Sequence, residues 1–184
     1  MTNPDIQCIL LDSHTIARRV GELATLISRD YRKKSLLVVG VLKGAFIFMA
    51  DLIRAIERPC DIDFLAVSSY GKQSVTTGAV RILKDTDSDI GGRDVLIVED
   101  ILDSGTTLSY IMNVMNSRRP ASVAICALLD KPERRRTPVD ARYVGFQTPD
   151  EFMVGYGLDY AGRYRNLPYI GVLKREIYAP AIDN

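Results

Sequence analysis

The amino-acid sequence predicts an α/β fold in which a parallel sheet is flanked by helices. Apolar runs with β-branched residues recur along the chain, and segments with helical periodicity separate them. The runs 36–42 and 95–98 lack the alternation of a half-exposed strand, which is typical of parallel strands covered on both faces. A chain of 184 residues has the usual size of one domain, so we expect a single domain over 1–184.

The first half of the chain predicts two helices and three strands. Ser13 can cap a helix over about 14–31, because its hydroxyl can accept a hydrogen bond from a free backbone N–H. The apolar residues of this helix recur on one face, namely Ile16, Val20, Leu23, Ala24 and Ile27. The other expected elements are strands over 35–42, 61–69 and 79–84, a helix over 45–57 that Pro59 stops, and a polar loop over 70–77.

The second half continues this alternation and then ends in short strands. The strand at 95–98 precedes a helix over about 106–116, and a strand over 122–129 follows. Further short strands are expected at 143–146, 152–155 and 169–172. We expect the core to span about 35–130, and a small hood beside it to form from N-terminal residues and about 143–175.

Composition and charge exclude several classes of protein. A net charge of +1 gives no basic field for nucleic acid, and no apolar run approaches the roughly 20 residues of a membrane span. No signal peptide is evident. Cys8, Cys60 and Cys126 are odd in number and widely spaced, which indicates a reducing cytoplasm and neither a disulfide framework nor a zinc site. His14, the only histidine, is expected at the surface near a helix start.

Residues 95–108 place charged side chains directly after a buried strand, in the order VLIVEDILDSGTTL. Glu99, Asp100 and Asp103 fall where we expect the strand to end and a loop to begin, which is where open α/β sheets bind ligands. Three carboxylates grouped there would repel one another. Polyol hydroxyls or a metal ion are therefore implied as their partners.

The loop that begins at Asp103 leads into the N-terminus of the predicted helix, where free backbone N–H groups and the helix dipole favour an anion. Gly105 permits a close approach, and Ser104, Thr106 and Thr107 add hydroxyl donors. The loop lacks the Gly-Lys-Ser/Thr of a Walker A motif and the glycine spacing of a dinucleotide site. A monophosphate is the expected ligand, and a helix cap without a ligand is the alternative.

This segment resembles the signature of the type I phosphoribosyltransferases, which bind phosphoribosyl pyrophosphate. The shared features are an apolar strand, Glu-Asp, two apolar residues and Asp-Ser-Gly-Thr-Thr. The resemblance implies the type I phosphoribosyltransferase fold and Mg²⁺ as cofactor. It also implies that Glu99 and Asp100 hold the ribose 2′- and 3′-hydroxyls, and that the backbone and hydroxyls of 104–107 hold the 5′-phosphate.

Two further segments resemble the hypoxanthine-guanine branch of that family. Lys43 and Gly44 match its pyrophosphate loop, in which a non-proline cis peptide precedes the lysine. Ser69 and Tyr70 match its closing loop, which would exclude water from the reaction centre.

The segment from Leu129 to Leu167 resembles the purine site of the same branch. Each residue alone could be an ordinary core, cap or surface residue, but their joint order and spacing support the assignment. The basic run 134–136 is interpreted as a solvated loop, with a contact to another subunit as the lesser alternative. The implied roles are Lys131 donating to O6, Phe152 stacking on the base, Met153 contacting it through its backbone, Asp159 holding a second Mg²⁺ near the base, and Arg165 binding pyrophosphate.

The expected activity is transfer of 5-phosphoribosyl to N9 of hypoxanthine or guanine, giving IMP or GMP and pyrophosphate. Asp103 would act at N7 of the base as general base or proton relay. Lys131 favours a 6-oxo over a 6-amino group, because an ammonium can only donate. The family implies a homodimer or homotetramer. Two alternatives stay open: a xanthine-preferring phosphoribosyltransferase, and a non-catalytic protein that senses phosphoribosyl pyrophosphate.

Overall fold

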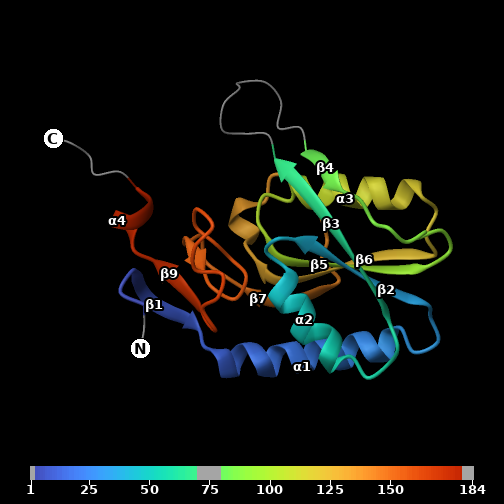
Figure 1. Ribbon diagram of the computed structural model, residues 1–184, viewed down its shortest axis with the longest axis horizontal. Helices are drawn as coiled ribbons and strands as arrows, with labels where there is room; N and C mark the ends of the chain where they lie inside the picture. Colours follow the sequence, from blue (N-terminus) through green and yellow to red (C-terminus); the bar gives the residue numbers. More distant parts are fainter. Residues whose placement is uncertain (1–2, 70–79, 180–184) are drawn as a thin grey trace.

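A computed structural model describes residues 3–69 and 80–179 of the protein. Its strands form two sheets that lie side by side (Figure 1). The strands are β1 (Ile6–Leu11), β2 (Leu36–Leu42), β3 (Asp61–Ser69), β4 (Val80–Lys84), β5 (Asp94–Leu102), β6 (Ser122–Asp130), β7 (Tyr143–Gln147), β8 (Met153–Val154) and β9 (Ile170–Leu173). The helices are α1 (Ser13–Asp30), α2 (Phe46–Ala55), α3 (Thr106–Ser117), α4 (Arg175–Tyr178) and the 3₁₀ helix η1 (Pro132–Arg134).

The larger sheet has the strand order β4-β3-β2-β5-β6-β7. All of its neighbouring strands run parallel except β4, which pairs antiparallel with β3 at one edge. The main sheet is therefore mixed and not wholly parallel. The reason is the short spacing between Ser69 and Val80, which leaves fewer residues than the dozen or so that a parallel crossover needs.

The central strand β5 is buried on both faces, as its unbroken apolar run predicts. Leu96 and Val98 pack in the hydrophobic cluster that contains α1 and α2. Val95 and Ile97 pack in the cluster that contains α3. Because successive side chains of a strand point to opposite faces, both sets must be apolar and no alternation is left in the sequence.

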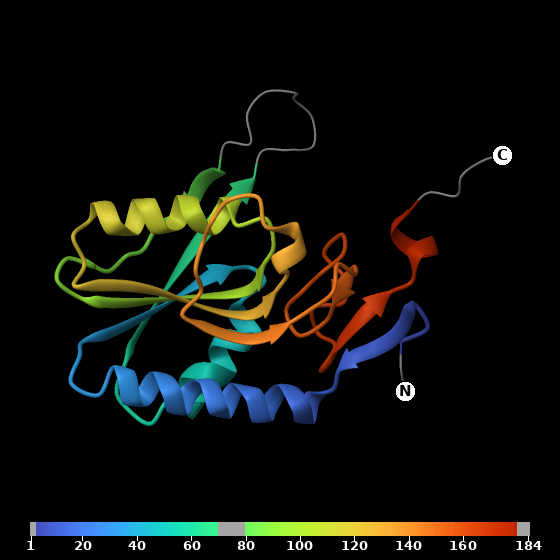
Figure 2. The same cartoon turned by 180° about the vertical axis from the view of Figure 1, so that it is seen from behind.

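The helices cover both faces of the main sheet, with α1 and α2 on one face and α3 on the other (Figures 1 and 2). The predicted apolar face of α1 is confirmed, and it consists of Ile16, Val20, Leu23, Ala24 and Ile27. The predicted cap is wrong by one residue: the Asp12 carboxylate accepts the N–H of Thr15 at 2.7 Å, and Ser13 is already helical. His14 is exposed in the first turn.

The smaller sheet, the hood, joins the two ends of the chain. It has the strand order β1-β9-β8 and is antiparallel, with Ile6 opposite Leu173 and Val154 opposite Gly171. The expectation that 143–146 belongs to the hood is wrong, because β7 pairs parallel with β6 at the edge of the main sheet.

The hood lies beyond the end of the main sheet toward which β6 and β7 run (Figure 2). The carboxyl ends of the parallel strands, where ligands of open α/β sheets bind, therefore face the segment around β8. No helix of the described residues is long and apolar enough to cross a membrane.

Phe48 and Phe46 share one helix but differ in burial, which allows a matched test of this core. Phe48 is fully buried against the main sheet, whereas Phe46 is 44% exposed. Phe48→Ala should lower the free energy of unfolding by about 3–5 kcal/mol because it leaves a cavity. Phe46→Ala should lower it by about 1 kcal/mol or less. Urea unfolding measures both variants, and equal losses would contradict this packing.

Candidate active site

The carboxylates of the 95–108 segment do not all lie in a loop. β5 continues to Leu102, so Glu99 and Asp100 belong to the strand and only Asp103 follows it. The expectation that the strand ends before Glu99 is thus wrong. The pairing with β6 explains it, because Glu99 still lies opposite Ala127. The strand thereby carries two carboxylates into the protein interior.

Burial strongly perturbs both of these carboxylates. It raises the pKa of Asp100 to about 6, although the Ile101 N–H at 2.9 Å and the Arg165 charge act in the opposite direction. Burial and the neighbouring Asp100 charge raise the pKa of Glu99 well above its ordinary value. Glu99 keeps a partly exposed edge, but its Oε2 is shielded from solvent and has no hydrogen-bond partner among the described residues. For Asp100, the Ile101 N–H and the Arg165 charge offset only part of the cost of burial. For Glu99, no donor to Oε2 lies among the described residues.

Gly44 brings the turn between β2 and α2 against Asp100. A Cβ atom at Gly44 would overlap Oδ2 of Asp100, so only glycine fits here. The peptide bond before Lys43 is cis, as the family resemblance implies, and the Lys43 side chain is exposed. Gly157, with φ 104°, packs against the carbonyl oxygen of Gly44. The turn at Gly44, the end of β5 and the segment after β8 thus meet at one place.

The expected phosphate loop lies at the start of α3. Gly105 has a φ of 81°, which favours glycine, and Thr106 is the first helical residue. The carbonyl oxygen of Ser104 accepts the N–H groups of Arg136 and Thr137 at 2.9 and 3.0 Å. The segment after η1 therefore supports this loop, and the N–H of Thr106 makes only a long 3.4 Å hydrogen bond to the Ser104 hydroxyl. An anion could compete for this N–H at the helix N-terminus.

The expectation that 134–136 is a solvated loop is wrong for Arg135, which is partly buried. The Arg135 guanidinium donates to the backbone carbonyls of Asp103 at 3.1 Å and Leu102 at 3.4 Å, and it pairs with the carboxylate of Asp130. It thereby ties the ends of β5 and β6 together. Sequence pattern could not single out Arg135, because it is one of three consecutive arginines.

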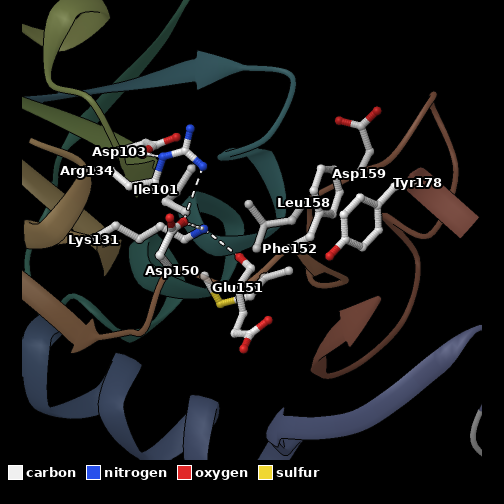
Figure 3. Close-up of a pocket in the computed structure, with 11 residues that line it drawn as sticks. Ile101, Asp103, Lys131, Arg134, Asp150, Glu151, Phe152, Leu158, Asp159 and Tyr178 are labelled. Atoms are coloured by element: carbon white, nitrogen blue, oxygen red, sulfur yellow. Dashed lines mark hydrogen bonds and ion pairs between the residues drawn. The ribbon is translucent and has the colours of Figure 1, made fainter. Parts of the chain in front are cut away.

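A cavity of about 460 Å³ lies between the carboxyl ends of β5 and β6 and the segment that leads into β8 (Figure 3). Lys131 is 6% exposed, and its Nζ donates to the carbonyl oxygen of Glu151 at 2.6 Å. Asp103 lies on the same cavity. The apolar part of the wall comes from Ile101, Phe152, Met153 and Leu158. The cavity thus presents an ammonium donor and a carboxylate acceptor beside a flat apolar wall.

The ring of Phe152 is fixed by two other aromatic rings. Tyr178 stacks on it with ring centres 4.7 Å apart and planes at 20°, and Tyr160 meets it edge-on at 5.4 Å. These contacts hold the ring plane in the cavity wall (Figure 3). Met153 beside it is buried.

Asp159 and Arg165 form an ion pair of 2.5 Å, and Arg165 also donates to the carbonyl oxygen of Gly157 at 2.6 Å. Both acidic oxygens of Asp159 are engaged, because the second accepts the N–H of Gly162 at 2.7 Å. Within 3–69 and 80–179, no three acidic, histidine or cysteine side chains gather as one metal site. Glu99, Asp100 and Asp159 are therefore not brought together as a single cluster.

Of the two residues expected in the closing loop, the structure describes only Ser69. Ser69 is the last residue of β3. Tyr70 and the polar segment 70–77 lie outside the described residues.

Replacing Asp100 by Asn should stabilise the protein in the absence of ligands and metal ions. Its pKa is raised from 3.8 to about 6 in the folded state. The folded state therefore binds this proton more tightly than the unfolded state does. As a result, the free energy of unfolding falls as pH rises from about 4 to about 6. Asn removes the buried charge and keeps an acceptor for the Ile101 N–H.

For Asp100→Asn we expect the free energy of unfolding to rise by about 1–3 kcal/mol at pH 8 and to stay nearly unchanged at pH 4. Melting curves in EDTA at both pH values measure this. The exposed Asp140→Asn is the control, with a change of about 0.5 kcal/mol or less. A variant that is less stable at pH 8 would contradict the destabilising role of the Asp100 charge.

Comparison with known proteins agrees with this geometry. The family model of the phosphoribosyl transferase domain matches residues 7–161. The chain is 50% identical over 178 residues to the hypoxanthine-guanine phosphoribosyltransferase of Bacillus subtilis, covering 97% of this chain and 99% of that protein. A crystal structure of a hypoxanthine phosphoribosyltransferase from Staphylococcus aureus matches with a TM-score of 0.91 and 50% identity over 95% of each chain. A hypoxanthine phosphoribosyl transferase from Trypanosoma cruzi matches with a TM-score of 0.92 and 42% identity over 97% of each chain. The chain therefore belongs to the phosphoribosyltransferase family and has its type I fold.

Proposed function

We propose that the protein is a purine-salvage enzyme that transfers 5-phosphoribosyl from phosphoribosyl pyrophosphate to N9 of hypoxanthine or guanine. One observation carries this proposal: the cavity that holds Lys131 and Asp103 lies at the end of the strand that buries Glu99 and Asp100. An ammonium and a carboxylate on one cavity match the O6 acceptor and the N7–H donor, which are neighbours on a 6-oxopurine. The function of the relatives agrees with it.

Each part of phosphoribosyl pyrophosphate has a complementary part of the site. The two ribose hydroxyls would donate to Glu99 and Asp100, and the 5′-phosphate would accept from the N–H and hydroxyl groups of 104–107. Pyrophosphate would be held by Lys43, the backbone of Gly44, and Arg165. Ser69 and Tyr70 are proposed to cover the reacting carbon.

The acidic residues fit a divalent cation as cofactor, and we propose Mg²⁺. Burial raises the pKa of both Glu99 and Asp100 despite the Arg165 charge near Asp100, and Oε2 of Glu99 has no donor among the described residues. Oxygen ligands of this kind suit Mg²⁺, which keeps several waters and substrate oxygens in its shell. When bound, Mg²⁺ would neutralise the charge that develops on leaving pyrophosphate. Asp159 is the proposed protein ligand of a second Mg²⁺, near the base.

The chain's own residues would orient the base and move its proton. Lys131 would donate to O6, and the backbone of Met153 would contact the base. Phe152, already fixed by Tyr178, would stack on it. Asp103 would accept the proton at N7 while N9 attacks C1′ and pyrophosphate leaves with inversion. The transition state resembles an oxocarbenium ion, so a dry site protects it from capture by water.

The first experiment is to incubate the protein with phosphoribosyl pyrophosphate, Mg²⁺ and one of four bases. Hypoxanthine and guanine should give IMP and GMP, whereas adenine should give no nucleotide, because Lys131 cannot accept from a 6-amino group. Product with xanthine in preference to both would favour a xanthine-preferring enzyme. Absence of nucleotide with every base would leave the non-catalytic sensor of phosphoribosyl pyrophosphate as the function.

A second experiment with this assay concerns Asp103. Asp103→Asn keeps the size of the side chain but removes its ability to take a proton, so kcat should fall by about 10²–10⁴-fold. Steady-state kinetics with hypoxanthine measures this. Unchanged kcat would remove Asp103 from the proton transfer.

We further propose a cytoplasmic homodimer or homotetramer. The described part of the chain leaves two large apolar side chains at one edge of the main sheet exposed, Ile62 at 49% and Leu83 at 63%. Such side chains are suited to a surface that a second copy covers.

A further inference from the structure

Arg134 points into the base cavity, although neither the motif nor the proposed reaction assigns it a role (Figure 3). It is the last residue of η1, which directly follows Lys131 at the end of β6. Its Nε lies 3.0 Å from Oδ1 of Asp103, and its Nη1 donates to Oδ1 of Asp150 at 3.2 Å. The guanidinium thus joins the residue after β5 to the segment before β8 across the cavity.

The contact with Asp103 is an ion pair that leaves the acceptor free. The Nε of Arg134 approaches Oδ1 without forming a hydrogen bond. Oδ1 is shielded from solvent and has no hydrogen-bond partner among the described residues. Arg134 therefore holds the carboxylate through Oδ1, whereas Oδ2 makes no hydrogen bond or ion pair among the described residues and can still accept a proton from a bound base.

Asp150 connects Arg134 to the O6 donor. Its Oδ1 lies 3.6 Å from Nζ of Lys131 as well as 3.2 Å from Arg134. Lys131, Asp150, Arg134 and Asp103 therefore form one chain of alternating charge along the cavity wall. O6 and N7 are neighbours on a purine, so the donor for one and the acceptor for the other must keep a fixed spacing.

The neighbouring arginines differ from Arg134 in this respect. Arg135 is committed to the carbonyls at the end of β5, and Arg136 meets the phosphate loop through its backbone N–H. Of the three, only Arg134 lines the cavity. Its charge is therefore the one in the run that acts on the base side.

We propose that Arg134 is a positioning residue, which holds the Asp103 carboxylate at the N7 position and keeps it in register with Lys131 through Asp150. This inference rests on the proposed function of Asp103. The side chains of Arg134, Asp103 and Asp150 are each between 41% and 47% exposed. Solvent therefore screens the ion pairs that Arg134 makes with the two carboxylates, and the expected effect on kcat is moderate.

The test compares the kinetics of Arg134→Met and Arg134→Lys with wild type. Arg134→Met should lower kcat with hypoxanthine by about 3- to 10-fold and leave KM for phosphoribosyl pyrophosphate and the melting temperature unchanged. Arg134→Lys should recover part of kcat, since an ammonium keeps the charge but cannot span both carboxylates. Arg54→Met is the matched control, because Arg54 is also an exposed arginine paired with an aspartate, on α2.

A double variant separates action through Asp103 from action on the base itself. If Arg134 works by positioning Asp103, then Asp103→Asn combined with Arg134→Met should have the kcat of Asp103→Asn alone. Multiplied losses would overturn the proposal, as would wild-type kcat in Arg134→Met. A raised KM for phosphoribosyl pyrophosphate with a lowered melting temperature would also overturn it, because that pattern marks collapse of the phosphate loop. A wild-type protein that forms no nucleotide would instead overturn the proposed function.

Discussion

The burial of Glu99 and Asp100 at the end of β5 is the constraint on which the rest of the site depends. Two adjacent carboxylates out of water destabilise the free protein, and their raised pKa values express this. The arrangement persists because β5 is held on both faces by large apolar clusters and on both edges by parallel neighbours. The well-packed middle of β5 thus keeps the two carboxylates buried at its end. Substrate hydroxyls and a cation are the groups that would stabilise their charged forms.

The other parts of the site are arranged around this pair. Gly44 reaches Asp100 only because it has no side chain, and Gly157 reaches Gly44 in the same way. These contacts bring the β2–α2 turn and the segment after β8 to the end of β5. The cavity for the base then lies between that end and the hood-side segment, where Lys131 and Phe152 face it. The proposed sites for the base and for phosphoribosyl pyrophosphate would therefore adjoin, because the strand ends that carry them already meet.

The local features were predictable from sequence, whereas contacts between distant segments were not. Strand 61–69 matches β3, because burial and flanking polar residues mark it locally. The helix after Gly105 likewise begins where its loop chemistry predicts. A hood that joins N-terminal and C-terminal residues was expected, but the antiparallel register of β1 with β9 has no local signal, since the partners come from opposite ends of the chain. The expectation that β7 belongs to the hood was wrong for a similar reason, because the sequence of a short strand does not indicate which of two sheets it joins.

The three arginines after β6 show where sequence reasoning about a site stops. They are identical in type and adjacent, so no periodicity or motif separates them. Their directions are set by η1, a single turn that aims Arg134 at Asp103 while Arg135 turns back to the carbonyls of β5. The helix η1 begins at Pro132, and its position follows from the pairing of β6 with both β5 and β7. The position of the Arg134 charge beside Asp103 therefore depends on the assembled sheet, and a motif confined to β5 and α3 could not contain it.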